Sequence, residues 1–381
     1  MLLKYYKMNN IIYHEVQPDN NDTAGYGQFS TLDFTLESDG RKLNPNSIRI
    51  DFDLEAESTA GTVIDSGDQI FIDNKVGCHA LFESYQVEVQ SRGIIENLQE
   101  APRWHAVHAS SSYSEGDFYN LGLQAEGRGI HTKSGNYILQ DVGHKGEDSA
   151  SHLKSPKYSI RPLICLNRMV GDAYSFSKNG YIKISVNLAR NGHVFHGVDV
   201  DANVQYTIKN VTLRYTSRPD DGKQGKMMMN SVTNIKTSVN SAQSNIVCRV
   251  PSKAVNGVVI CFLEQSKEGD LASNNLALEA YGQLDSAEYR FNDATNKYVT
   301  YRLEDKGDMV RKGLQALNDG NINQAHARHL NANQGNIIGL PFLEYIDLST
   351  SKFSVELQSG LNNLSANPRL VYLYFLTLIE M

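Results

Sequence analysis

Apolar and polar residues alternate with a period of two in segment after segment of this chain. Residues 48–54 read IRIDFDL, and residues 182–188 read IKISVNL. Successive side chains of a β-strand point to opposite faces, so this pattern predicts strands with one face in a core and the other facing water. Shorter copies of the pattern lie at 32–36, 85–89, 246–250 and 353–357. The chain is therefore expected to be all-β and built from antiparallel sandwiches.

Two stretches break the alternation because they are apolar throughout. Residues 258–263 read VVICFL, and residues 370–379 read LVYLYFLTLI. The second stretch is about half as long as a membrane-spanning helix and rich in β-branched and aromatic residues, which favours a buried strand. Strands covered on both faces have this composition. We expect the two domains to pack against each other, or against a neighbouring subunit, through these strands.

The length of 381 residues fits two domains. The segment 217–225, SRPDDGKQG, follows a strong strand pattern and is rich in turn-forming residues, so it is the predicted linker. The division is an N-terminal arm at 1–12, a first sandwich at 13–216 with a long polar loop at 109–158, and a second sandwich at 226–381. No sequence repeat joins the halves.

Helical signals are sparse, and they lie between predicted strands. Asp308 is the expected N-cap of a helix that ends near Gly320, and Pro102 begins a shorter one that reaches about His108. Around Asn210 the apolar phase slips by one residue, which predicts a β-bulge. The expected fold is thus two tandem β-sandwiches with short helices in the loops.

The order of these segments carries a family resemblance over nearly the whole chain, from about residue 25 onward. The first half contains GCHALFESYQVEV, then GIIE, then GYIKISVNL and YTIKNVTLRY; the second closes with GLPF, IDLS, KFSVEL and the strand 368–379. This order resembles the double jelly-roll major capsid proteins of tailless, membrane-containing icosahedral bacteriophages, a lineage that also includes adenovirus hexon. Each motif is weak alone, and the resemblance lies in their order and spacing.

The resemblance implies a structural role with no enzymatic activity. Three chains would place six jelly rolls in a pseudo-hexagonal capsomer of a virion shell that is assembled in the host cytoplasm. The expected partners are neighbouring capsomers, penton proteins and minor capsid proteins. The arm at 1–12 would lie on the inner surface, where it would contact an internal viral membrane or a neighbouring capsomer. Loop 109–158 would form an outer tower or a clasp between subunits.

Charge and cysteine spacing exclude several other classes. The net charge is −7, and no Lys/Arg cluster offers a phosphate-binding face, so direct nucleic-acid binding is not expected. The N-terminal residues lack the apolar run of a secretion signal. No C-x-x-C pair is present, so we expect buried, reduced thiols at the four cysteines, Cys78, Cys165, Cys248 and Cys261.

Few residues offer catalytic or metal-binding chemistry. Three histidine pairs have a spacing of three, without the Glu of an H-E-x-x-H site: His105/His108, His193/His196 and His326/His329. The acidic pairs Asp199/Asp201 and Asp220/Asp221 have the composition of an acid–base or calcium site, but polar loop ends are far commoner. We therefore predict no catalytic, cofactor-binding or metal-ligating residue.

Two alternatives stay open from the sequence. Some glycan-acting amidases also use tandem jelly rolls, and such an enzyme would need carboxylates clustered in a cleft, with Asp51, Asp53, Asp199 and Asp201 as the first candidates. A virion spike or sugar-binding protein would instead need an aromatic-lined glycan site in a loop. Trp104, the one tryptophan, is expected to anchor packing beneath the long loop and not to bind a ligand.

Overall fold

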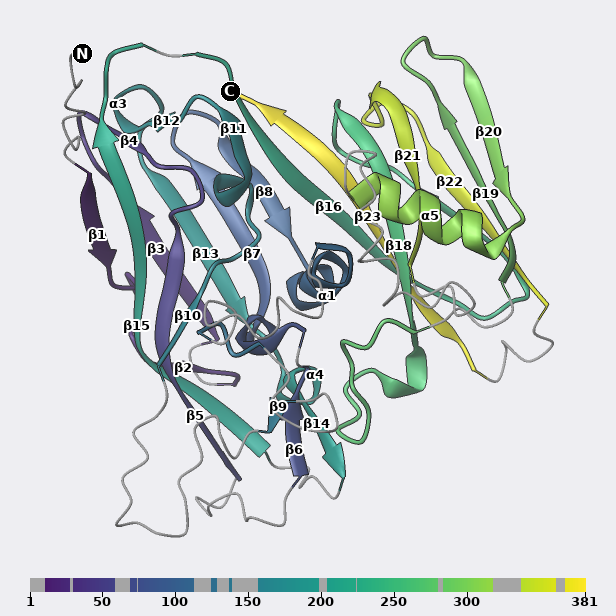
Figure 1. Ribbon diagram of the computed structural model, residues 1–381, viewed down its shortest axis with the longest axis horizontal. Coiled ribbons are helices and arrows are strands. Elements are labelled where there is room, and N and C mark those ends of the chain that lie inside the picture. The colour runs from purple at the N-terminus through teal and green to yellow at the C-terminus, as the bar shows by residue number, and fades with distance from the viewer. Residues whose placement is uncertain are drawn as a thin grey trace, which may run out of the picture.

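The strands form two β-sandwiches that lie side by side along the longest axis of the molecule (Figure 1). The computed structural model describes residues 11–27, 30–58, 69–73, 75–112, 125–128, 137–138, 157–198, 204–223, 225–279, 284–317, 337–360 and 367–381. Strands dominate these residues, and the short helices lie between them. The predicted all-β class is confirmed.

The first sandwich packs a seven-stranded sheet on a four-stranded one. The larger sheet has the order β10 (Lys157–Ile160), β5 (Arg49–Ser58), β15 (Val204–Pro219), β4 (Arg41–Leu43), β12 (Tyr174–Ser175), and β15 also pairs with β1 (Ile12–Val16) and β2 (Ala24–Gly25). The smaller sheet has the order β3 (Thr31–Leu36), β13 (Ile182–Leu188), β7 (Phe82–Val89), β8 (Gly93–Leu98).

The second sandwich contains the remaining long strands. One sheet has the order β11 (Met169–Gly171), β16 (Met227–Val239), β23 (Arg369–Glu380), β18 (Val255–Glu264), β21 (Ile337–Ile346). The other has the order β17 (Gln243–Cys248), β22 (Phe353–Ser359), β19 (Leu284–Asn292), β20 (Tyr298–Leu303). Strand β11 precedes β15 in the chain but pairs with β16, so the first half contributes one strand to this sheet.

The two sandwiches share one topology. When β16 to β23 are counted one to eight, their sheets have the orders 1-8-3-6 and 2-7-4-5. The first sandwich repeats both orders when β1 and β2 together count as its first strand and the others are β3, β5, β7, β8, β10, β13 and β15. Each sandwich is therefore a jelly roll, with two sheets packed face to face. The predicted tandem jelly rolls are confirmed, and the duplication is structural only.

The strand phases agree with the alternation in the sequence. In β5 the side chains of Ile50, Phe52 and Leu54 are buried, and in β13 the burial alternates in the same way. The predicted bulge is also present, because the register between β15 and β5 shifts between Lys209 and Thr212. Asn210 has a φ of 52° there, a conformation that asparagine tolerates better than most residues.

The two apolar stretches are strands buried on both faces, as predicted. In β18, Val258, Ile260 and Phe262 point into the core of the second sandwich. Val259 and Cys261, between them, belong to a different cluster that is continuous with the core of the first sandwich. Strand β23 alternates between the same two clusters. The outer face of this sheet is therefore part of the seam, by which we mean the contact between the two sandwiches.

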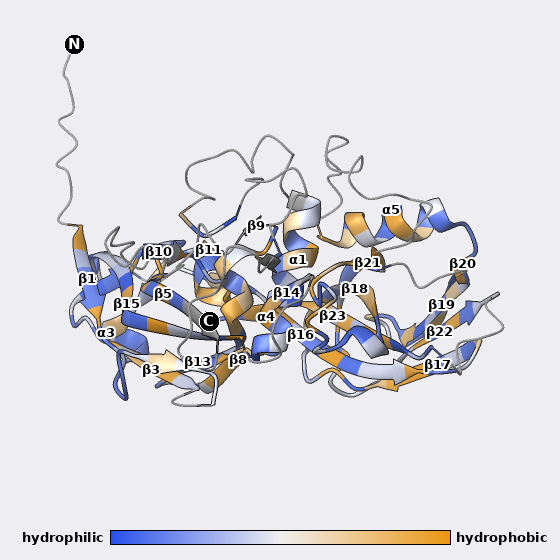
Figure 2. Cartoon of the chain, turned by 90° about the horizontal axis from the view of Figure 1, so that it is seen from below, coloured by the Kyte–Doolittle hydropathy of each residue, from blue (hydrophilic) through white to orange (hydrophobic). Residues whose placement is uncertain are grey.

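Two helices of twelve residues lie on the same side of the sandwiches (Figure 2): α1 (Ala101–Ser112) and α5 (Lys306–Leu317). Each follows the fifth strand of its sandwich. The predicted cap of α5 is wrong by three residues, because the Asp305 carboxylate accepts the backbone N–H of Asp308. Asp308 therefore lies in the first turn, and Asp305 is the acceptor that satisfies the helix start.

The remaining elements are short. A small sheet joins β14 (Phe195–Val198), β6 (Gln69–Ile72) and β9 (Tyr137–Ile138). One-turn helices are η1 (Gly77–Leu81), η4 (Cys165–Arg168), α3 (Phe176–Asn179), α4 (Asn191–Val194) and η5 (Gln265–Lys267). Most of the predicted loop 109–158, and residues 1–10 of the predicted arm, lie outside the described residues.

Candidate functional site

Aromatic packing fills the seam between the sandwiches. Trp104 on α1 is 1% exposed, and its ring lies 5.2 Å from that of Tyr374 on β23. The Tyr374 hydroxyl donates a hydrogen bond to the carbonyl of Glu100, just before α1. Trp104 was predicted to anchor packing beneath the long loop. In the structure it packs against a strand of the second sandwich.

Charged groups surround this aromatic contact. The Arg103 guanidinium carbon lies 4.3 Å from the centre of the Tyr372 ring, and the same side chain donates to the carbonyls of Asn275 and Ala277. Lys236 on β16 donates to the carboxylates of Glu100 and Glu268. Burial opposes the charge of Lys236, but these hydrogen bonds raise its pKa above the usual range.

A buried carboxylate also ties β8 to β16. Glu96 is 3% exposed, and it accepts hydrogen bonds from the Ser231 hydroxyl at 2.6 Å and from the backbone N–H of Cys165 at 2.6 Å. Arg168 donates at 3.4 Å to the same carboxylate oxygen that accepts from Ser231. A buried charge is stable only with such partners. The bond to Ser231 crosses the seam, so Glu96 fixes where the first sandwich meets the second.

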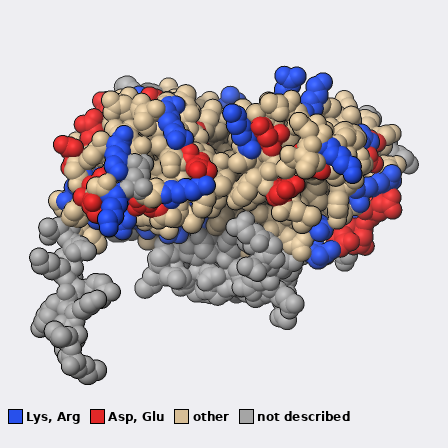
Figure 3. Space-filling view, turned by 90° about the horizontal axis from the view of Figure 1, so that it is seen from above, with Lys and Arg blue, Asp and Glu red and all other residues tan. Residues whose placement is uncertain are grey.

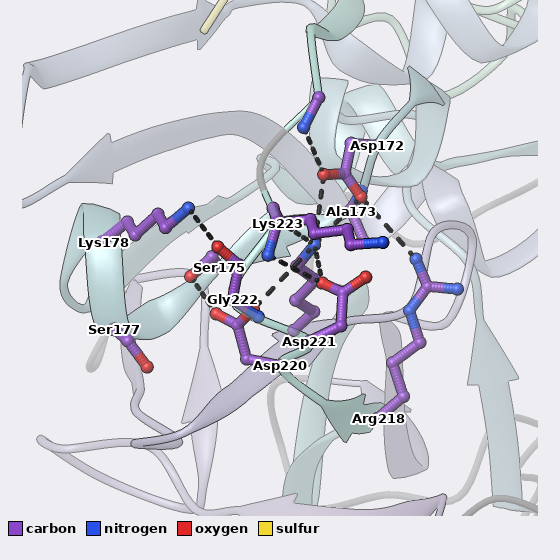
Figure 4. A network of polar contacts seen from close by, with 12 residues as sticks. Asp172, Ala173, Ser175, Ser177, Lys178, Arg218, Asp220, Asp221, Gly222 and Lys223 are labelled. Carbon is purple, nitrogen blue, oxygen red and sulfur yellow. Dashed lines mark hydrogen bonds and ion pairs between the residues drawn. The ribbon is translucent and has the colours of Figure 1, made fainter.

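The acidic pair Asp220/Asp221 lies in a cluster with Asp172, where the chain passes from β15 toward β16 (Figure 4). A cation is already present there, because the Lys42 side chain, only 3% exposed, points its ammonium at the carboxylates. Its Nζ lies 3.1 Å from Asp172, 2.9 Å from Asp221 and 3.9 Å from Asp220. The acidic spot is therefore a lysine clasp, with the ammonium among the carboxylates that were candidates for calcium or catalysis.

The clasp fixes the connection between the sandwiches. Asp172 precedes β12, yet it accepts the backbone N–H of Gly225 at 2.8 Å and lies 3.8 Å from Arg218. Burial alone would favour the neutral acid, but the hydrogen bonds from Gly225 and Ala173 and the charge of Lys42 lower the pKa of Asp172 to about 2. Nothing in the local sequence marked Lys42, because its partners are far away in the chain.

Two histidines form a further buried polar group. His79 in η1 and His105 on α1 stack with ring centroids 3.9 Å apart. The His79 Nε2–H donates to Glu126, whereas the Nδ1 of His105 accepts from Arg128. Burial first, and then the nearby arginines, hold the pKa of His79 well below its usual range; burial and the adjacent His79 do the same to His105. Both imidazoles are therefore neutral at pH 7.

The predicted histidine pairs do not act as pairs. His105 stacks on His79, while the ring of His108 lies 6.4 Å from that of Trp104. His193 lies 3.6 Å from Glu83, and His196 packs on Phe71. The pair His326/His329 lies outside the described residues. Within the described part of the chain, no group of three or more His, Cys, Asp or Glu is placed to hold a metal ion.

The carboxylates named for a glycan-acting enzyme have structural partners. Asp51 is 4% exposed and forms a 2.7 Å ion pair with Arg214, and Asp53 accepts from the side chain of Asn210. Asp199 and Asp201 lie outside the described residues. All four cysteines are free as predicted, although Cys248 is only half-buried.

The outer surface carries both signs of charge. Figure 3 shows Lys and Arg side chains interspersed with Asp and Glu over one face, with uncharged areas between them. Large apolar side chains are exposed mainly at the two far ends, on β1 and on β20 with β21. None of the described helices is both long and apolar enough to cross a membrane.

Comparison with known proteins identifies the fold. No family model and no curated protein matches the sequence. Among solved structures, the Faustovirus major capsid protein matches with a TM-score of 0.64 and 8% identity, over 100% of this chain and 92% of that one. The PBCV-1 virus capsid matches at 0.58 and 10% identity, over 99% and 96%. The mavirus major capsid protein matches at 0.50 and 9% identity, over 97% and 90%.

This chain has the double jelly-roll fold. The matches span both sandwiches of this chain and nearly all of each capsid chain, so the similarity includes the way the two jelly rolls are joined. The fold implied by the family resemblance of the sequence is confirmed. Identities of 8–10% mean that the likeness lies in the strand order and not in shared side chains.

Proposed function

We propose that this protein is the major capsid protein of a tailless icosahedral virus, and that it forms a homotrimer whose six jelly rolls build a pseudo-hexagonal capsomer. The observation that carries the proposal is the repeat of one topology in two sandwiches joined through a broad apolar seam. The capsid proteins that share the fold support the same role. The role is structural, and its place is the virion shell, assembled in the host cytoplasm.

The direction in which the sandwiches are joined supports a closed ring. In the first sandwich, the side that ends in its fifth strand, β8, faces the second sandwich, because Glu96 on β8 is bonded to Ser231 on β16. The second sandwich presents its first strand, β16, to this contact. A contact between unlike sides is heterologous, and repeated heterologous contacts close into rings when the rotation fits. Three chains then place six jelly rolls in one ring.

The domain division belongs to this proposal. We place the first jelly roll at 13–216, the linker at 217–225 and the second jelly roll at 226–381, with the arm at 1–12 before them. In support, β16 begins at Met227, just after the linker, although β15 pairs with β4 of the first sandwich as far as Pro219, three residues into the linker. The lysine clasp would hold the linker in place.

Further partners follow from the shell. Neighbouring capsomers, penton proteins and minor capsid proteins would contact the outer sides of the ring. The arm combines Leu2, Leu3 and Tyr5 with Lys4 and Lys7, a composition suited to weak attachment to an anionic membrane or to a neighbouring capsomer. Flotation of the full chain and of a variant without residues 1–10 on anionic vesicles tests the membrane contact.

Light scattering on the purified full chain tests the proposal. The expected mass is about 127 kDa, three times the chain mass of 42.5 kDa, at micromolar concentration. Electron micrographs should show three-lobed, pseudo-hexagonal particles. A stable monomer under these conditions, or particles without that outline, would overturn the trimeric capsomer. Hydrolysis of a glycoprotein glycan that is abolished by Asp51→Asn would instead support an enzyme.

A further inference from the structure

A groove with an apolar lining opens at the far end of the second sandwich, between β20, β21 and α5. It has a volume of about 330 Å³ and is lined mainly by Phe291, Val299, Tyr301, Leu340, Pro341 and Phe342. The rings of Phe291 and Phe342 lie 4.7 Å apart in its wall. Both β20 and β21 are edge strands of their sheets, so this end of the sandwich has no strand beside it in the described chain.

A bulge in β21 places a leucine in water beside this groove. Pro341 pairs with Gly257 of β18, and the next paired residue, Ile346, lies opposite Val255. Four residues of β21 therefore face a single residue of β18, and the backbone leaves the sheet there. Leu343 at this bulge is fully exposed, and Tyr345 is 49% exposed. Apolar side chains gathered at an exposed edge mark an interaction surface.

A second apolar cluster lies at the opposite end of the molecule. Ile11 is 53%, Ile12 44% and Tyr13 82% exposed, and the last two belong to β1. Strand β1 pairs with β15 through one of its edges. Figure 1 shows β1 and β20 at the two extremes of the long axis, so one chain cannot bring these clusters together.

The contact inside the chain shows which sides fit each other. In this contact, β8 of the first sandwich lies against β16 of the second. β8 is the fifth strand of its sandwich, and β16 is the first strand of its own. The sides left open are the fifth and sixth strands of the second sandwich, β20 and β21, and the first strand of the first sandwich, β1. A second copy of the chain therefore offers the side that the open groove lacks.

We propose that the groove beside Leu343 receives the segment Ile11–Tyr13 of a second copy of this chain. The inference rests on the proposed capsomer and names the side chains that join its subunits. Leu343 packs on the neighbour's β1 edge, and the apolar residues of that edge cover the groove wall. Each chain supplies one groove and one β1 edge, so the contact repeats head to tail around the ring.

Charge placed at either end of the contact tests it. Leu343→Asp and Tyr13→Asp should each raise the dissociation constant of the trimer at least roughly 30-fold, because a buried leucine-sized contact is replaced by a carboxylate that needs water. Ile94→Asp is the matched control. Ile94 on β8 is an exposed apolar residue like the other two, with 59% of its surface exposed, but it lies outside the proposed contact. That control should remain trimeric. Circular dichroism checks that all three variants fold.

A cysteine pair locates the contact directly. Leu343→Cys protein mixed with Tyr13→Cys protein should form a disulfide-linked dimer under mild oxidation, whereas Leu343→Cys mixed with Ile94→Cys should not. Three of the four native cysteines are buried, and the wild-type chain measures any background from Cys248.

The outcomes separate the two proposals. If the wild type is a monomer, the capsomer itself is overturned. A second outcome is a trimeric wild type whose Asp variants form trimers of equal affinity and whose cysteine variants form no cross-link. In that case the capsomer stands and this contact is wrong. Loss of the trimer in both Asp variants, together with the specific cross-link, establishes the contact.

Discussion

The indole of Trp104 and the ring of Tyr374 pack at 5.2 Å between a helix of the first jelly roll and a strand of the second. Both side chains are almost completely buried, and the Tyr374 hydroxyl is bonded to the backbone that leads into the helix. Two residues that are 270 positions apart thus join the domains, and the one tryptophan of the chain reports on their seam.

Trp104→Ala should lower the free energy of unfolding by about 3–5 kcal/mol, because it leaves a cavity at the seam. Trp104→Phe keeps most of the packing and should cost about 1 kcal/mol. Urea unfolding followed by circular dichroism at one protein concentration measures both. Ile94→Ala, at an exposed apolar position, should change the stability by less than about 0.5 kcal/mol. Equal effects of Trp104→Ala and Ile94→Ala would contradict the anchoring role.

Lys42→Met should lower the free energy of unfolding by about 3 kcal/mol, because it leaves the carboxylates of the clasp facing one another without their cation. Lys226→Met is the control: Lys226 forms a 3.0 Å ion pair with Glu380 in which both side chains are about 60% exposed, and such pairs contribute about 0–1 kcal/mol. Chemical denaturation compares the two variants. If both lose the same small amount, the clasp is an ordinary surface ion pair.

The Asp172 carboxylate gives the clasp its own pH dependence. Its pKa is about 2 in the folded protein and about 3.9 in an unfolded chain. The stabilisation is therefore complete above pH 4 and is lost as the pH falls through about 2. Asp172→Asn should remove this contribution. The free energy of unfolding of the variant should therefore fall less steeply than that of the wild type between pH 4 and pH 2. A parallel decline of both proteins would show that Asp172 does not titrate in this way.

The stacked histidines predict acid sensitivity at higher pH. The folded pKa values of His79 and His105 are well below 6.5, the unfolded value, so the unfolded chain binds more protons once the pH falls below 6.5. The contribution of the neutral histidines to the free energy of unfolding is complete above that pH. Below it, this free energy declines by about 1.4 kcal/mol per pH unit for each histidine that stays neutral. His105→Gln should therefore show a shallower decline between pH 6 and 4 than the wild type. A decline of His105→Gln that runs parallel to that of the wild type would show that the stacked histidines do not act in this way.

The thiols should react slowly in the native protein. Burial raises the pKa of Cys261 to about 12 and that of the half-buried Cys248 to about 11. Burial also raises the pKa of Cys78 and Cys165 well above the usual range. The thiolate is the reactive form, so a thiol reagent at pH 8 should modify Cys248 first and the other three only after unfolding. Rapid modification of Cys165, the residue beside Glu96, would show that the seam opens in solution.

Strand positions followed from the sequence because their cause is local. Side chains alternate across a strand whatever it pairs with, so IRIDFDL and IKISVNL showed which residues of β5 and β13 face the core. The same logic assigned 258–263 and 370–379 to strands covered on both faces. The start of α5 was missed by three residues because Asp305 and Asp308 are equally plausible caps in sequence, and only the backbone path decides between them.

The amino-acid sequence by itself determined an all-β chain, its strand phases and the two strands that needed a second core. Tertiary structure alone decided what fills the polar sites. Lys42 meets Asp172 across 130 residues, and Glu96 meets Ser231 across 135, so no local pattern records either contact. A buried charge needs a partner in space and not a neighbour in sequence. For that reason the acidic pair at 220 and 221 became a clasp only when the fold brought a lysine to it.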